Sequence, residues 1–250
     1  MTDGSCRLSG NALKIIAALT MVIDHVGLLF FPKVAIFRII GRLAFPIFAF
    51  MISEGARYTS SKLRYFSTMF GLAFICQAVY FFFDDGSLDM CVLVTFSVAI
   101  ALIYVMQFVK AGILSPKTSW FIRPFYVTVG LLALWAVKII NSLLEIDYGL
   151  WGCILPAFAS LLDFRGMEIP KWLKKLNLDN VYARILSFGV GVAILAHASG
   201  IIQYFSLFAI PLLLLYSGKR GRLKMKYFFY FFYPLHLVFL EAIFLLTRLL

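Results

Sequence analysis

Nine apolar stretches, each separated from the next by a more polar connection, constrain the fold of this 250-residue chain more than any other feature. A helix needs about 20 mostly apolar residues to cross a bilayer, and about 17–25 are tolerated. The sixth, seventh and eighth stretches are shorter than this. The sequence therefore predicts an all-α, polytopic transmembrane helical bundle of about nine spans, or roughly eight to ten. The stretches are 11–31, 34–55, 65–83, 91–109, 122–140, 148–162, 184–198, 202–216 and 227–248.

Composition excludes the soluble classes of protein. Hydrophobic residues make up 62% of the chain and charged residues 14%, whereas soluble domains contain about 45–50% and about 25%. A soluble core of this size could not bury so much apolar surface, and the excess would form an aggregation-prone patch. These figures exclude a soluble globular protein, a disordered chain and a coiled coil. They predict one integral-membrane domain over residues 1–250.

The charge of the chain indicates its orientation. A formal charge of +11 comes from 23 lysines and arginines against 12 acidic residues. In a soluble protein this excess would suggest nucleic acid, but in a membrane protein it reports which side each connection faces. If the N-terminus is cytoplasmic, 18 of the 23 basic residues lie on the cytoplasmic side, so we predict that topology and no nucleic-acid partner. The outer connections then hold Asp84, Asp85, Asp89, Glu145 and Asp147.

The cysteines and histidines give no metal-binding pattern. No histidine is near a cysteine or a second histidine in sequence, and there is no CxxC pair. Because a free cysteine behaves as a small hydrophobe, we expect buried thiols and no metal ion. The four cysteines are Cys6, Cys76, Cys91 and Cys153.

A few ionisable residues lie inside the predicted spans, where a charged group costs at least about 2.5–3.5 kcal/mol on insertion scales. Such residues persist when they face a partner or a cavity. Lys138 needs no special explanation, because its long side chain can reach the interface. The others are candidates for function: Asp24 and His25 in the first span, Arg38, Arg42 and Glu54 in the second, and His236 and Glu241 in the last.

Helical geometry places several of these residues at a similar depth. With a rise of about 1.5 Å per residue, His25 lies roughly 6 Å outward from the centre of its span, and Arg42 lies roughly 4–5 Å outward. Arg38 lies roughly 10 Å outward, and His236 is close to the midplane. Asp24 points about 100° away from His25 on the helical wheel, so we expect it to act through a residue of another helix. Depth does not show lateral convergence, but each group gains by meeting a partner.

The last span contains a proline next to polar side chains. Pro234 removes one helical hydrogen bond and frees a backbone carbonyl. Tyr233 and His236 place polar groups beside this predicted kink. The alternative is an aromatic packing stripe in which the histidine is simply hydrogen-bonded.

Basic residues gather at the predicted cytoplasmic rim. The run 217–226, SGKRGRLKMK, carries five positive charges, and Arg57 and Lys62 follow the second span. Such a rim can attract an anionic, phosphate-bearing molecule. Alternatively, it serves only to set the topology and to attract anionic lipid. Glu54, at the same end, could act locally as the partner of Arg57.

The same blocks resemble a known family. They are LTMVIDHVGLLFFP, FRIIGRLAFPIFAFMISEGARYT, Tyr148-Gly149 with Gly152, and the terminal YFFYFFYPLHL. In this order, from residue 11 to the end, they are similar to the TraX family. That family is named for the conjugative protein that N-acetylates F-pilin, and it is similar to a wider clan of multi-pass membrane acyltransferases.

The resemblance implies transfer of acetyl from acetyl-CoA to an amine or hydroxyl acceptor at the bacterial cytoplasmic membrane. The acceptor would be a protein N-terminus, such as that of a pilin, or an envelope glycan. Histidine can act as base or nucleophile near neutral pH, and an adjacent arginine can stabilise an oxyanion. The expected residues are, for catalysis, His25, Asp24, Arg42 and His236; for substrate, Arg38, Glu54, Tyr233 and Tyr148; and for donor phosphates, Arg57, Lys62, Lys219, Arg220 and Arg222.

Two other functions also fit the sequence. A proton-coupled transporter or permease could use Asp24, His25 and Arg42, with Glu241, as a proton relay across kinked helices. The absence of an inverted repeat and the odd number of predicted spans weigh against it. A non-catalytic membrane scaffold is the third possibility, and it leaves the buried charges unexplained.

Overall fold

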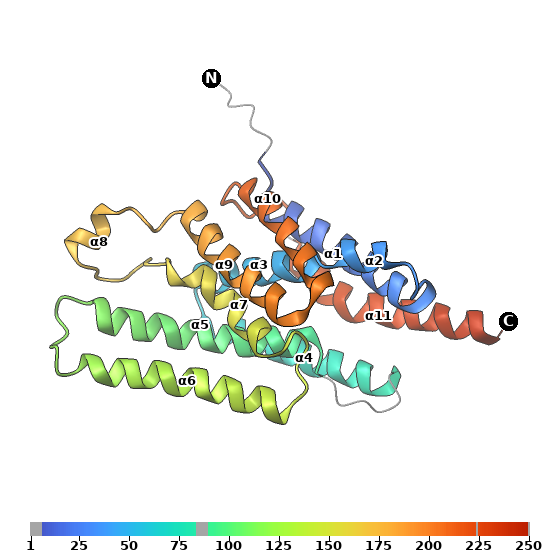
Figure 1. The fold of residues 1–250 in the computed structure, drawn as a ribbon, viewed down its shortest axis with the longest axis horizontal. Coiled ribbons are helices and arrows are strands. Elements are labelled where there is room, and N and C mark those ends of the chain that lie inside the picture. The colour runs from blue at the N-terminus through green and yellow to red at the C-terminus, as the bar shows by residue number, and fades with distance from the viewer. Residues whose placement is uncertain (1–6, 84–89, 224, 250) are drawn as a thin grey trace, which may run out of the picture. The chain divides into compact units, whose positions relative to one another are not determined.

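The protein is all-helical in the computed structural model, which describes residues 7–83, 90–223 and 225–249 (Figure 1). No strand occurs in these ranges, so the predicted fold class is confirmed. Asp84, Asp85 and Asp89 lie outside them. The helices are α1 (Gly10–Phe30), α2 (Ala35–Gly41), α3 (Ala44–Tyr58), α4 (Lys62–Phe83), α5 (Val92–Leu114), α6 (Arg123–Leu143), α7 (Gly149–Leu161), α8 (Lys171–Lys175), α9 (Val181–Ser199), η1 (Ile201–Phe208), α10 (Ala209–Leu214) and α11 (Lys226–Leu249).

Each of the nine predicted stretches is helical over most of its length. In the described residues, six helical segments are long and apolar enough to cross a membrane, with α2 and α3 taken together as one of them. Gly149–Leu161 and Ile201–Leu214 are shorter apolar helices. The chain is therefore an integral membrane protein. The number of nine spans and the cytoplasmic N-terminus stay predictions.

The second stretch was predicted as one span, but the structure divides it into two helices. Helix α2 ends at Gly41, and α3 begins at Ala44. The cause is Pro46, which lacks the N–H that would bond to the carbonyl of Arg42 and whose ring would clash with that carbonyl. Proline is tolerated in the first turn of a new helix, so the chain restarts as α3. The break leaves Arg42 at the C-cap of α2.

The chain folds as two compact units. Unit 1 comprises Met1–Met51 and Val192–Leu250, and unit 2 comprises Ile52–Gly191. Helices α3 and α9 each contribute to both units. The single functional domain expected over residues 1–250 stays a prediction.

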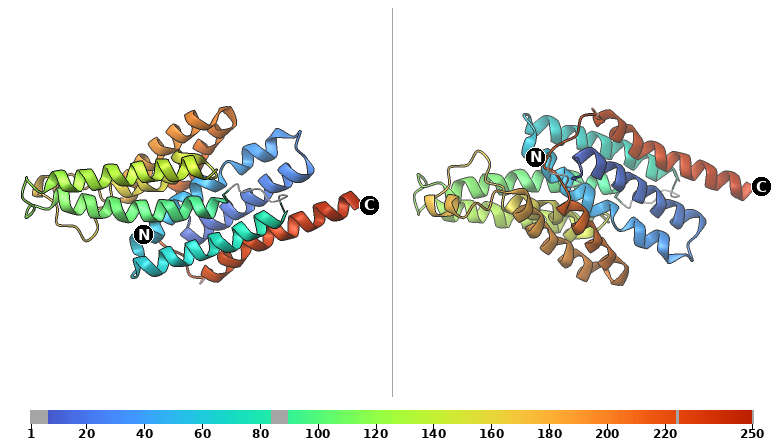
Figure 2. Two further views of the ribbon diagram at one scale, coloured as in Figure 1. Left: turned by 90° about the horizontal axis from the view of Figure 1, so that it is seen from below. Right: turned by 90° about the horizontal axis from the view of Figure 1, so that it is seen from above.

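Unit 1 is built on a pair of helices near the N-terminus. Helix α1 packs along α2 and against α11, and α2 packs against η1. In the right-hand view of Figure 2, α1 lies between α2 and α11. The approach of α1 to α2 depends on glycine, because a Cβ at Gly27 would overlap the side chain of Phe37. A Cβ at Gly41 would likewise overlap Asp24. Small residues of this kind let helices approach closely in membranes.

Substituting Gly27 should therefore destabilise the protein. We expect Gly27→Ala to lower the free energy of unfolding by about 1–3 kcal/mol, as overpacking does. The matched control is Gly71→Ala in α4, where an added Cβ meets nothing within 4 Å. That control should raise stability by about 0.5–1 kcal/mol, since alanine is the better helix former. Unfolding in mixed micelles measures both, and equal losses would contradict the packing described here.

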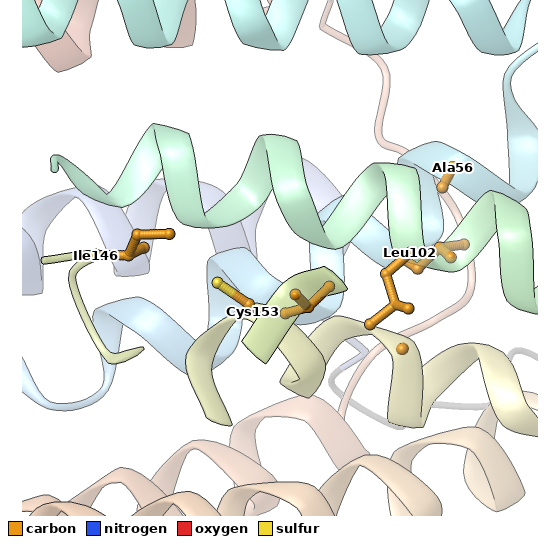
Figure 3. Close-up of a cluster of buried hydrophobic side chains, with 7 residues drawn as sticks. Ala56, Leu102, Ile146 and Cys153 are labelled. Atoms are coloured by element: carbon orange, nitrogen blue, oxygen red, sulfur yellow. The ribbon is translucent and has the colours of Figure 1, made fainter. Parts of the chain in front are cut away.

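Unit 2 is organised around α5. This helix packs against α4, α6 and α7. Leu102 and Ile103 of α5 meet Cys153 of α7 in a buried apolar cluster (Figure 3). On α6, by contrast, the buried residues are Gly130 and Val137, so most of its apolar surface faces outward. Such a surface suits contact with lipid.

Candidate functional site

Two histidines meet in unit 1. His25 of α1 and His236 of α11 have ring centroids 5.2 Å apart, with an edge-to-face angle of 77°. The Nδ1 of His25 lies 2.9 Å from the carbonyl oxygen of Met21, and the Nδ1 of His236 lies 3.0 Å from that of Phe232. A carbonyl only accepts, so each Nδ1 carries a hydrogen, and in the neutral form of each ring Nε2 is the basic nitrogen.

His236 is enclosed by aromatic rings. Phe232 stacks on it with centroids 5.1 Å apart, and Tyr233 meets it edge-on at 5.4 Å. His236 is buried, and its Nε2 has no hydrogen-bond partner in the part of the chain that the structure describes. The alternative, a core histidine with all its hydrogen bonds made, therefore holds for Nδ1 of His236 but not for its buried Nε2.

Asp24 is held by another helix, as expected. Its Oδ2 accepts a hydrogen bond of 2.9 Å from Nη1 of Arg38 on α2, and both side chains are largely buried. Its Oδ1 has no partner among residues 7–83, 90–223 and 225–249. This ion pair ties α2 to the helical turn that carries His25. It also neutralises most of the charge that the two residues bring into the bundle.

Arg42 contacts a residue that the sequence argument missed. Its Nη1 donates to Oε1 of Gln203 on η1 at 3.2 Å. Gln203 and its neighbour Ser206 are uncharged, so the cost of burying ionisable groups does not predict them. The available signal was an amide inside an apolar stretch, since a buried amide needs hydrogen-bond partners.

The basic loop at residues 217–223 is anchored to the start of α1. The backbone N–H of Gly10 donates to the carbonyl of Lys219 at 2.8 Å, and the backbone N–H of Asn11 donates to the carbonyl of Arg220 at 3.0 Å. The Asn11 side chain donates to the carbonyl of Leu223 at 2.7 Å. These bonds satisfy N–H groups that a helix start otherwise leaves unpaired. The side chains of Lys219, Arg220 and Arg222 are exposed.

Lys14 lies on the same helix between this loop and His25. Its Nζ is 5.8 Å from the ring centroid of Phe229 on α11, a cation–π distance. His25 is eleven residues further along α1, which corresponds to about 16 Å at the helical rise. Lys14, near the basic loop, and His25, of the histidine pair, are therefore about three turns apart on α1.

Four expected site residues belong to unit 2 and have partners there. Glu54 of α3 forms a buried ion pair with Arg184 of α9. Arg57 donates to Asp163 at 2.5 Å and to Asp179 at 2.7 Å. The remaining two are Lys62, 5.2 Å from the ring of Tyr104, and Tyr148, the N-cap of α7 with φ 61°.

A family model described as "TraX protein" matches residues 9–244. The chain belongs to the TraX family. The matched range includes every residue expected in the candidate site. The family resemblance in the sequence is thus confirmed, although membership assigns no role to any single residue.

TraX-family membership agrees with one full-length relative. The chain is 26% identical over 255 residues to the "Probable fimbrial assembly protein FimC, serogroup H1" of Dichelobacter nodosus, which covers 93% of this chain and 94% of that one. It is 50% identical over 40 residues to "Uncharacterized protein RP591" of Rickettsia prowazekii (strain Madrid E), or 16% of each chain. No solved structure matches.

The candidate site is made of nitrogen and oxygen groups from separate helices. Within the described ranges, no group of three or more His, Cys, Asp or Glu side chains could hold a metal ion. The side chains that unit 1 brings together can instead move a proton, through His25 and His236, and bind an anionic or partly negative oxygen, through Arg42.

Proposed function

We propose that this TraX-family protein is a membrane-embedded acyltransferase that moves acetyl from acetyl-CoA to an amine or hydroxyl. The acceptor class is a protein N-terminus, such as that of a pilin, or an envelope glycan. The observation that carries the proposal is the contact between His25 and His236 inside an apolar helical bundle. Family membership supports it, and so does the fimbrial-assembly name of the relative.

His25 acts as the general base in this proposal. Its Nδ1 is fixed by the carbonyl of Met21, so Nε2 takes the proton of the acceptor N–H or O–H as that atom attacks the acyl carbon. His236 is in edge contact with the ring of His25. It takes up the proton from His25 or passes it on. A neutral histidine ring can act as this base, because the nitrogen that carries no hydrogen has a free lone pair.

Asp24 and Arg38 position the base. Their ion pair joins α1 to α2 beside His25, so it keeps the ring at a fixed place relative to Arg42. The guanidinium of Arg42 polarises the carbonyl of the acetyl group. Tyr233 lines the same group beside His236. Arg38, nearer the predicted outer side, contacts the acceptor.

The basic loop binds the phosphates of the donor. Lys219, Arg220 and Arg222 are exposed, and the loop that carries them is anchored to α1, so charge attracts the anionic end of acetyl-CoA. The thin acyl-bearing arm then follows α1 toward His25. In unit 2 the guanidinium of Arg57 is already bound by two carboxylates, which disfavours phosphate binding at Arg57. In the predicted topology this loop faces the cytoplasm, where acetyl-CoA is made.

Removing the loop charges should weaken donor binding. We expect the triple variant Lys219→Gln, Arg220→Gln, Arg222→Gln to raise the KM for acetyl-CoA severalfold with little change in kcat. The reason is that these groups bind the donor equally in the ground state and in the transition state. The matched control removes three exposed charges from α8 in unit 2, by Lys171→Gln, Lys174→Gln and Lys175→Gln. Steady-state kinetics in liposomes measures both. Equal KM changes would show a general charge effect and contradict a donor site at the loop.

Acetyl-CoA binding and proton flux separate the proposal from transport. The purified protein in liposomes should bind labelled acetyl-CoA saturably and transfer the label to an added envelope fraction. Substrate-dependent proton flux without label transfer would instead support the permease function and overturn the proposal.

A further inference from the structure

Arg42 is placed by a break in its helix. Because Pro46 ends α2, Arg42 stands at the C-cap and reaches across to η1, where its Nη1 donates to Gln203. Its Nε is buried, and no residue within the described ranges accepts a hydrogen bond from it. A guanidinium can donate five hydrogen bonds, so Arg42 has donor capacity that this part of the protein does not use.

Two residues of η1 share this property. Gln203 is 3% exposed and Ser206 is 0% exposed. They are three residues apart in a 3₁₀-helix, so their side chains lie on the same face. The Nε2 of Gln203 and the Oγ of Ser206 have no hydrogen-bond partner in residues 7–83, 90–223 and 225–249. Buried polar atoms are rarely left unpaired in this way, and each case needs an explanation.

The free atoms of this cluster are all potential donors. Arg42 occupies the carbonyl oxygen of the Gln203 side chain, so the NH₂ group of that amide points to the other side. Arg42 Nε–H, Gln203 Nε2–H₂ and Ser206 Oγ–H together suit an oxygen that carries negative charge. Among uncharged groups, the acceptor that suits these donors is a carbonyl oxygen, which carries partial negative charge.

Asp24 links the donor cluster of Arg42, Gln203 and Ser206 to His25. Asp24 pairs with Arg38 of α2. The side chain of Asp24 also lies against Gly41 of α2, where an added Cβ would overlap it. Arg42 follows Gly41 directly. Asp24 in turn precedes His25 on α1. The donor cluster and the proposed base are thus parts of one polar group in unit 1.

The geometry points to Arg42, Gln203 and Ser206 as the binding site for the carbonyl oxygen of the transferred acetyl group, an inference that rests on the proposed function. As the acceptor atom bonds to the acyl carbon, His25 takes the acceptor's proton, and the carbonyl electron pair moves onto the oxygen. The three donors stabilise that negative charge. When the pair returns, the carbon–sulfur bond breaks, and the departing thiolate takes the proton from His25.

Substitutions at Gln203 and Ser206 test this role. Gln203→Glu keeps an oxygen for Arg42 and the side-chain volume but removes the NH₂ donors, and Ser206→Ala removes one hydroxyl. We expect kcat to fall about 10²–10³-fold for Gln203→Glu, as for the loss of an oxyanion-hole donor, with the KM for acetyl-CoA little changed. The matched control is Ser97→Ala in α5, a buried serine whose hydroxyl donates to Leu93. It should transfer acetyl at the wild-type rate.

An infrared measurement distinguishes this role from a structural one. Acetyl-CoA labelled with ¹³C at the thioester carbonyl should show a lowered C=O stretching frequency when bound to wild-type protein. In Gln203→Glu and Ser206→Ala the band should return toward the solution value. If wild type transfers acetyl while both variants keep its band and its kcat, the inference fails and the proposed function stands. If wild type neither binds nor transfers acetyl, both fail.

Discussion

Replacing His25 by alanine is expected to reduce acetyl transfer by about 10²–10⁴-fold, the contribution of a general base. The variant should still bind acetyl-CoA, because the basic loop that holds the donor phosphates is separate from His25 along α1. Added imidazole should restore part of the activity, since a small base can enter the space left by the side chain. Single-turnover kinetics with labelled acetyl-CoA measures the rate, and equilibrium binding measures the affinity.

His197→Ala is the matched control for this experiment. His197 lies in the last turn of α9 and is exposed, with its Nδ1 3.1 Å from the hydroxyl of Tyr204. That variant should transfer acetyl at the wild-type rate. A folded His25→Ala protein that did the same would remove His25 from the mechanism.

The buried ion pair in unit 2 should give the largest loss of stability. Glu54→Gln leaves Arg184 in a buried position without that carboxylate's charge, and breaking such a pair costs about 3–5 kcal/mol. The free energy of unfolding should fall by this amount in denaturant titrations in mixed micelles. Since Glu54 was also expected to bind substrate, the activity per folded molecule should be measured alongside. An unchanged activity would assign Glu54 to stability alone.

An exposed pair provides the comparison. Lys117 and Glu168 are 2.7 Å apart, with side chains 79% and 60% exposed. Glu168→Gln should lower stability by less than about 1 kcal/mol, because exposed ion pairs contribute little. If Glu54→Gln cost no more than this, Glu54 and Arg184 would not form the buried pair described here.

The helices could be predicted from sequence because apolar runs determine where a membrane chain is helical. The first predicted stretch, 11–31, corresponds to Gly10–Phe30, and the last, 227–248, to Lys226–Leu249. The break at Arg42 was not predicted, because a proline near a helix start and a proline that divides a helix give the same local sequence pattern.

The candidate site could be predicted only in part. Depth along each span placed His25 and His236 at similar levels, and the structure brings their rings together. Lateral partners follow from packing, which periodicity does not encode. For this reason Arg38 as the partner of Asp24 was not foreseen, nor was Gln203, 161 residues from Arg42 in sequence.

The most direct test of acetyl transfer uses the purified protein in liposomes with radiolabelled acetyl-CoA and an envelope fraction from cells that lack the gene. Mass spectrometry then identifies the labelled acceptor. The proposed function predicts covalent label, with the mass of one acetyl group, on an amine or hydroxyl of one acceptor class, and no such label with His25→Ala protein. Equal labelling with wild-type protein, with His25→Ala protein and with empty liposomes would contradict it.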